Sequence, residues 1–248
     1  MIDLECIDNA KNGRFYKDED GNYYPSVTTK LGKVVTKGEG LMRWYAKQDS
    51  YQDAQDYMNQ RGQEGTNVHE ACESLLYGGV VETDGLRDNS IRRIQGFINF
   101  WQNYYPKVYN TEFVVRSKEW KYAGRVDLLL GIEETDTDFA LVDIKTSKGI
   151  YESHKLQLMF YLYALEEMGV TNADNTTLYV LLLKHRTKKG YQLKEIDYYP
   201  EMVVNKNQEY NHEFSERCDM RPKFKEELPK RFQLDPDKVE ELNATKHG

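Results

Sequence analysis

Two acidic residues and a lysine stand on neighbouring predicted strands near the middle of the chain. Asp127 lies in the segment GRVDLLL, and both Asp143 and Lys145 lie in the segment ALVDIKTS. Because side chains alternate along a strand, Asp143 and Lys145 share one face of an otherwise apolar strand that we expect to be buried. Buried charges cost free energy unless they are paired or bind a metal. Carboxylate oxygens suit Mg²⁺ and Mn²⁺, so these residues predict a divalent metal site.

A lysine beside such a site could orient or activate a water and offset negative charge that develops on a phosphate. The alternative is an ordinary Asp143–Lys145 ion pair on an edge strand, with Asp127 capping a turn. The two strands alone do not separate these interpretations, because the D-x-K tripeptide is common by chance.

Further polar residues surround this segment in a defined order. They form the motifs Gly65-x-x-x-His69, Gly124-x-x-Asp127, Asp143-x-Lys145-Thr146 and Gln157-x-x-x-Tyr161. Together they resemble the PD-(D/E)XK nuclease superfamily, and specifically its RecB-like exonuclease branch. The segments YPSVTTKL and GTNVH, with Trp44 between them, are also similar to the mitochondrial genome maintenance exonucleases and their phage relatives. The resemblance covers residues 24 to 194 approximately.

The resemblance implies a metal centre and assigns its residues. His69, Asp127 and Asp143 would hold one or two Mg²⁺ or Mn²⁺ ions, and the backbone carbonyl of Ile144 would add a ligand. Lys145 would position the attacking water. Glu112 matches an acid that relatives often hold near this position and is a secondary candidate; its alternative is a surface acid at a strand start.

Gln157 and Tyr161 lie one helical turn apart in an otherwise apolar segment, so both polar groups need partners. The resemblance places these two residues at the rim of the active site, in contact with the phosphate or with Lys145. The alternative is that each bonds to nearby backbone.

Four residues are candidates for DNA contact. The resemblance implies that Ser26 and Thr28 bind a phosphate, although hydroxyls at this position could equally cap a helix. Lys184 and Arg186 lie in a basic turn, where a backbone contact competes with a solvated hairpin tip. We therefore expect DNA as the substrate and partner, with single strands preferred.

Composition limits the class of protein. The chain has 248 residues, 39% of them hydrophobic and 30% charged, with a net charge of −7. The acidity argues mildly against a non-specific DNA binder unless basic residues gather on one face. No apolar run is long enough for a membrane helix, and no signal pattern is visible, so we expect a cytoplasmic protein without membrane contact, in the host cytoplasm if a phage encodes it. Three scattered cysteines indicate reduced thiols and are too few for the iron–sulfur cluster of some relatives.

The pattern of elements predicts an α/β fold with a mixed central sheet flanked by helices. This order matches the restriction-endonuclease-like core that the resemblance implies, with a helical N-terminal elaboration. We expect a single nuclease domain over 1–248, divided into a mainly helical part (1–110), a catalytic α/β core (111–222) and a polar tail (223–248). Helices are predicted over 39–60, 64–77, 89–105, 151–168 and from 200, and strands over 111–119, 122–131, 140–145, 177–183 and 191–196.

These observations predict a metal-dependent deoxyribonuclease, an exonuclease that hydrolyses phosphodiester bonds at single-stranded ends in recombination, repair or replication, including that of a phage. A helicase or recombinase is the kind of partner that such an activity implies. The alternatives are an endonuclease or nickase on the same core and a non-catalytic nucleic-acid-binding subunit. A zinc protease is set aside, because the segment HEACE lacks the second histidine of the H-E-x-x-H motif.

Overall fold

The centre of the fold is a mixed five-stranded sheet in the order β4-β5-β6-β7-β8. The structure, a computed structural model, describes residues 4–8, 12–133 and 135–215. Neighbouring strands are antiparallel except β6 and β7, which are parallel. The strands are β4 (Lys107–Ser117), β5 (Tyr122–Gly131), β6 (Phe139–Lys145), β7 (Thr176–Leu183) and β8 (Tyr191–Ile196). The mixed sheet with helices on its faces confirms the predicted fold class.

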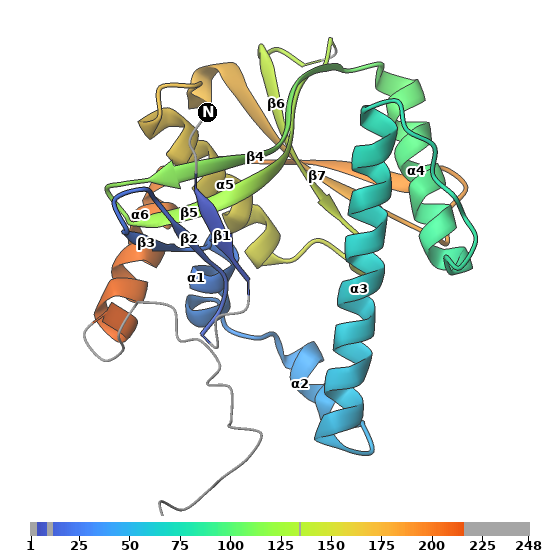
Figure 1. The fold of residues 1–248 in the computed structure, drawn as a ribbon, viewed down its shortest axis with the longest axis horizontal. Helices are drawn as coiled ribbons and strands as arrows, with labels where there is room; N and C mark the ends of the chain where they lie inside the picture. Colours follow the sequence, from blue (N-terminus) through green and yellow to red (C-terminus); the bar gives the residue numbers. More distant parts are fainter. Residues whose placement is uncertain (1–3, 9–11, 134, 216–248) are drawn as a thin grey trace, which may run out of the picture.

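Three helices cover one face of the sheet (Figure 1). Helix α5 (Glu152–Glu167) makes the crossover that the parallel pair β6–β7 requires. It is apolar nearly all round, because the sheet lies on one side of it and α1 (Val27–Val34) and α6 (Pro200–Tyr210) lie on the other. This face carries the larger of the two main hydrophobic clusters.

The opposite face is covered by α3 (Tyr51–Leu76) and α4 (Asp88–Tyr104), as Figure 1 shows. Helices were predicted over 39–60 and 64–77, but α3 begins at Tyr51 and continues through residues 61–63 without the expected break. Ser50 caps it by accepting a hydrogen bond from the Asp53 amide at 3.0 Å. Residues 61–63 are polar and exposed, so the apolar pattern that predicted helices on either side does not extend through them.

The N-terminal part adds a small antiparallel sheet and a short helix. Strands β1 (Glu5–Ile7), β2 (Phe15–Lys17) and β3 (Tyr23–Pro25) pair in that order, and α2 (Glu39–Tyr45) precedes α3. A 3₁₀ turn over Ala173–Asn175 precedes β7, and a π-helical turn over Asn211–Ser215 follows α6. The predicted polar tail over 223–248 lies outside the described residues. Among those described, no helix is long and apolar enough to cross a membrane.

A buried lysine fixes α1 to the rest of the fold. Lys30 is fully buried, and its Nζ donates to the Trp120 carbonyl at 2.6 Å and to Asn207 Oδ1 at 2.7 Å. The rings of Tyr122 and Tyr210 lie 5.4 and 5.0 Å from the same nitrogen. Burial lowers the pKa of Lys30 to about 7. One side chain thus links α1, the β4–β5 turn and α6.

Candidate active site

Asp127 on β5 is held by groups from a second strand and from a helix on the sheet. The Ile144 amide of β6 donates to its Oδ2 at 2.7 Å, and His69 Nδ1 of α3 lies 3.7 Å from the same oxygen. Burial raises the pKa of Asp127, while Lys145 and the Ile144 amide oppose this shift. The carboxylate is therefore oriented by the backbone of β6 and faces the histidine.

Asp143 and Lys145 lie together on β6, as alternation along the strand predicts. Lys145 Nζ donates to Asp143 Oδ1 at 2.7 Å. Nζ is also 2.7 Å from Oδ2, but Oδ2 is buried and has no hydrogen-bond partner among the described residues. Burial raises the pKa of Asp143 to about 6, against the opposing charge of Lys145. The edge-strand alternative fails, because β6 lies between β5 and β7.

Gln157 and Tyr161 extend this pair onto α5. Gln157 Nε2 donates to Asp143 Oδ1 at 3.0 Å and lies 2.9 Å from the Tyr161 hydroxyl. The two side chains therefore share a network with the catalytic candidates, and the alternative of purely local backbone bonds does not describe them. Gln157 contacts Asp143 rather than Lys145, and Tyr161 contacts Gln157.

Gly124 explains the first position of the Gly124-x-x-Asp127 motif. A Cβ added at Gly124 would collide with Cε1 of the Tyr161 ring and would crowd Val27 Cγ2 at 3.2 Å. The absence of a side chain at this point of β5 thus leaves room for the Tyr161 ring to pack directly against the strand.

Glu112 joins His69 and Asp127 from the neighbouring strand β4. It stands between the paired positions Thr111–Leu128 and Phe113–Val126, which places it opposite Asp127. One ligand atom from each of His69, Glu112 and Asp127 lies within 4.8 Å of the other two. Glu112 has a φ of 47°, a left-handed conformation that costs a non-glycine residue free energy and is found at functional sites.

The charges around Glu112 and His69 suit a cation. Burial, Asp127 and Glu73 raise the pKa of Glu112 to about 7. Burial and the nearby Lys145 lower the pKa of His69, so its imidazole is neutral near pH 7, the form that ligates metals. The predicted ligands His69 and Asp127 are therefore together, whereas Asp143 is hydrogen-bonded to Lys145 and Gln157 and lies outside this triad. For Ile144, it is the amide that contacts Asp127.

The four residues predicted to contact DNA lie at the start of α1 and in the β7–β8 turn. Ser26 is buried and caps α1 by accepting from the Thr29 amide at 3.0 Å, so the capping interpretation accounts for its hydroxyl. Thr28 is exposed. Lys184 Nζ donates to Gln192 Oε1 at 2.6 Å across the β7–β8 hairpin, and Arg186 is exposed in its turn.

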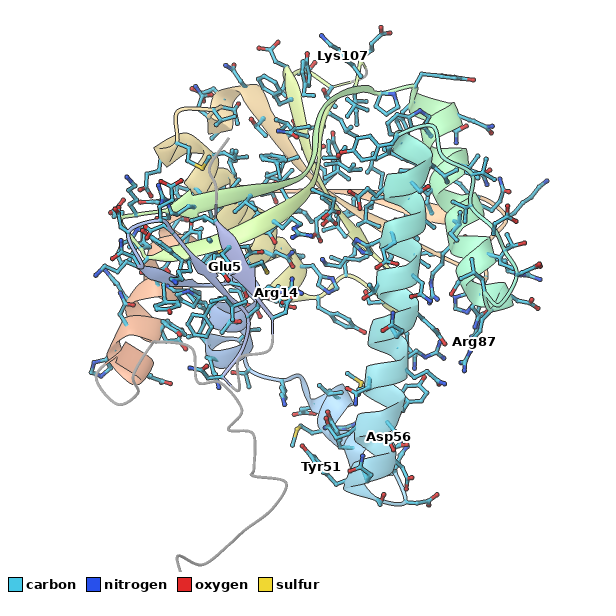
Figure 2. The ribbon with its side chains drawn as sticks, in the orientation of Figure 1. Glu5, Arg14, Tyr51, Asp56, Arg87 and Lys107 are labelled. Carbon is cyan, nitrogen blue, oxygen red and sulfur yellow. The ribbon has the colours of Figure 1, made fainter. Side chains whose placement is uncertain are left out.

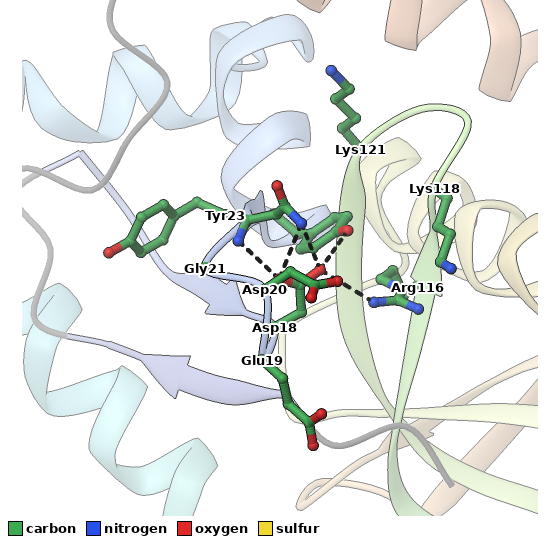
Figure 3. A pocket seen from close by; sticks show the side chains of 10 residues that line it. Asp18, Glu19, Asp20, Gly21, Tyr23, Arg116, Lys118 and Lys121 are labelled. Atoms are coloured by element: carbon green, nitrogen blue, oxygen red, sulfur yellow. Dashed lines mark hydrogen bonds and ion pairs between the residues drawn. The ribbon is translucent and has the colours of Figure 1, made fainter.

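A separate cavity of about 760 Å³ lies beside the β2–β3 turn (Figure 3). Asp18, one of the three acids in its lining, accepts hydrogen bonds from Asn22 and Tyr24 and lies 3.5 Å from Arg116. None of the residues that line this cavity belongs to the candidate active site.

Three neighbouring antiparallel strands, β4, β5 and β6, thus bring three acids and a lysine to one place, with a histidine from α3 and a glutamine from α5. The sequence model of the PD-(D/E)XK nuclease superfamily matches residues 41–242. The chain therefore belongs to this superfamily. No curated protein sequence matches the chain.

Solved structures show weak likenesses. The alkaline exonuclease LHK-Exo from Laribacter hongkongensis is 10% identical with a TM-score of 0.41, over 76% of this chain and 84% of that one. Its complex with dAMP is 11% identical with a TM-score of 0.37, over 59% and 75%. A candidate exonuclease from Eubacterium rectale is 10% identical with a TM-score of 0.40, over 73% and 79%. These values carry no assignment of substrate.

Proposed function

We propose that the protein is a metal-dependent DNA exonuclease of the RecB-like branch, which removes nucleotides from single-stranded ends. The observation that carries the proposal is the approach of His69, Glu112 and Asp127 to within 4.8 Å of one another beside the buried Asp143–Lys145 pair. Hard oxygen ligands with one imidazole suit Mg²⁺ or Mn²⁺. Recombination, repair and replication, including those of a phage, are processes in which this activity would act.

The protein groups have separate tasks. When bound here, Mg²⁺ or Mn²⁺ would act as a Lewis acid, which lowers the pKa of a bound water and offsets negative charge on the leaving oxygen. Asp127 stays oriented for the ion through the Ile144 amide. Lys145 donates a hydrogen bond to the attacking water and steadies charge on the phosphate. Asp143 keeps Lys145 protonated, because its carboxylate raises the lysine's pKa against the effect of burial.

Gln157 and Tyr161 keep Asp143 in place. Gln157 bonds to the oxygen of Asp143 that also accepts from Lys145, which leaves Oδ2 as the oxygen without a hydrogen-bond partner among the described residues. In the proposed mechanism, Oδ2 completes the ligand set of the ion. Gln157 and Tyr161 are therefore positioning residues.

The proposal is tested by degradation of end-labelled single-stranded DNA in Mg²⁺ or Mn²⁺, with Asp143→Ala and Lys145→Ala beside wild type. We expect metal-dependent loss of label by wild type and a rate reduced about 100-fold or more in both variants. Asp138→Ala, an exposed acid just before β6, is the matched control and should cut like wild type.

The same assay separates the competing functions. Cutting of a circular single strand would replace the exonuclease with an endonuclease or nickase. Binding of the strand without cutting in either metal would favour a non-catalytic subunit. Equal cutting by wild type and Asp143→Ala would contradict the assigned site.

A further inference from the structure

Arginines gather where α3, α4 and the β7–β8 turn meet. The charges of Arg93, Arg186, Arg61 and Arg92 all act on His185 and lower its pKa, together with the dominant effect of burial. Arg87, at the start of α4, joins them through Glu64. We call these five residues the arginine cluster: Arg61, Arg87, Arg92, Arg93 and Arg186.

Glu64 organises the cluster from α3. It is buried, and each of its carboxylate oxygens accepts from one guanidinium, Oε2 from Arg61 and Oε1 from Arg87, both at 2.7 Å. Figure 2 shows Arg87 at the N-terminal end of α4, next to α3. Two arginines thus share the one negative charge of Glu64. The cluster therefore keeps a net positive charge.

Arg93 has a buried donor from which no protein group among the described residues accepts. It is 7% exposed, and its buried Nε has no hydrogen-bond partner among the described residues. Burial lowers its pKa, and the neighbouring charge of Arg61 acts in the same direction against Glu64. A desolvated guanidinium with an unused donor is costly unless an anion pairs with it.

Close contacts join the two segments, α4 and the β7–β8 turn, that carry three of the arginines. Gly96 of α4 lies against the backbone of Gly190, so a Cβ at Gly96 would collide with the Gly190 carbonyl. Asn99 Nδ2 also donates to the Lys189 carbonyl at 3.0 Å. These contacts hold the basic β7–β8 turn against α4, next to Arg92 and Arg93.

The cluster is close to the candidate active site along α3. Gly65 follows Glu64 directly, and a Cβ there would lie 3.1 Å from Oγ1 of Thr146, the residue after Lys145. Arg61 precedes His69 by two helical turns, about 12 Å along the axis. This interval is much shorter than one turn of DNA, which is about 34 Å, so a phosphate bound at the cluster would belong to a nucleotide near the bond to be cut.

We propose that the arginine cluster is a phosphate-binding site that holds internal phosphodiesters of the substrate strand a few nucleotides from the bond to be cut. The inference rests on the nuclease function proposed above. Guanidinium forks match phosphate oxygens in pairs, and arginine is less strongly hydrated than lysine. The site explains how a chain with a net charge of −7 retains a polyanion.

The test is strand binding by fluorescence anisotropy without divalent metal, so that no cutting is needed. We expect Arg61→Gln and Arg87→Gln each to raise Kd about tenfold and to reduce the salt slope by about one. Lys107→Gln, an exposed cation in another part of the molecule (Figure 2), is the control and should bind like wild type. Arg93→Lys keeps the charge but loses the fork, and we expect it to weaken binding while circular dichroism stays that of wild type.

Unchanged Kd and salt slope in Arg61→Gln and Arg87→Gln would overturn the proposal, even if the protein cuts DNA. Conversely, weakened binding by these variants supports the site even if no cutting is observed, so the two proposals fail separately. Strands with a 5′-phosphate and with a 5′-hydroxyl distinguish the source of the phosphate. Equal effects of the substitutions on both strands support binding of internal phosphodiesters. An effect confined to the phosphorylated strand would show that the cluster binds the terminal phosphate, and would overturn the proposal.

Discussion

Lys145 and Lys30 are both taken out of water, but their partners differ. Lys145 has a carboxylate at 2.7 Å, and although burial alone would lower its pKa, Asp143 and Asp127 raise it. Lys30 has a backbone carbonyl and a side-chain amide as acceptors, and burial lowers its pKa to about 7. In this fold, the lysine that acids surround keeps its charge, whereas the lysine with neutral acceptors does not.

The two environments suit opposite tasks. Lys145 remains a cation beside a carboxylate oxygen that lacks a hydrogen bond. It can therefore donate hydrogen bonds to a phosphate and to the water that attacks it. Lys30 can give up its charge with its donors still satisfied, and it serves to join α1 to the β4–β5 turn and α6. The comparison predicts that the same substitution at the two lysines affects different properties.

The largest expected effect is on cleavage. Lys145→Met should lower kcat for strand hydrolysis about 100- to 1,000-fold, because a group that stabilises transition-state charge is lost. Lys30→Met should leave kcat within a few-fold of wild type at temperatures where the variant is folded. Single-turnover cleavage at saturating enzyme measures both, and an equal loss in the two variants would remove the distinction between the lysines.

The next effect is on stability. Lys30→Met leaves the Trp120 carbonyl and Asn207 Oδ1 buried without their donor, at about 1–3 kcal/mol for each unpaired acceptor. Urea unfolding at pH 7 should therefore show a lower free energy of unfolding. Lys47→Met, at an exposed lysine, is the control and should stay within about 0.5 kcal/mol of wild type. A Lys30→Met variant as stable as wild type would contradict the linking role.

A third effect is a pH dependence of stability. In the unfolded chain Lys30 has its ordinary pKa of 10.5, and in the folded protein about 7. Between these values the unfolded state binds more protons, so stability from this group rises as pH increases from 7 toward 10. The difference in unfolding free energy between wild type and Lys30→Met should therefore grow over this range. A difference that is constant or shrinks with pH would show that Lys30 stays charged when buried.

The sequence predicted the elements that have a strong local signal. The apolar runs that became β6 and β7, and the apolar helix between them, appeared close to their observed bounds, because a buried parallel pair needs such residues. The polar residues 61–63 in the middle of α3 gave no such signal, so two helices were predicted where the structure has one. The helical state of its first half depends on the Ser50 cap and on continuity with the packed second half.

The candidate site could be predicted in part. Asp143 and Lys145 followed from strand alternation, and His69 from the resemblance. The close placement of Glu112 depends on its backbone conformation and on the register between β4 and β5, which no local pattern encodes. The arginine cluster was hidden for a related reason, since its members come from segments more than 100 residues apart and meet only in the fold.

The central claim is that a divalent metal site at these acids drives strand cleavage. The most direct measurement is anomalous diffraction from crystals of the protein with Mn²⁺, at a concentration that supports cutting. We expect a peak with His69, Asp127 and Asp143 at about 2.0–2.3 Å, with Glu112 in contact directly or through water. A peak elsewhere, or no peak at a concentration at which the strand is cut, would contradict the account.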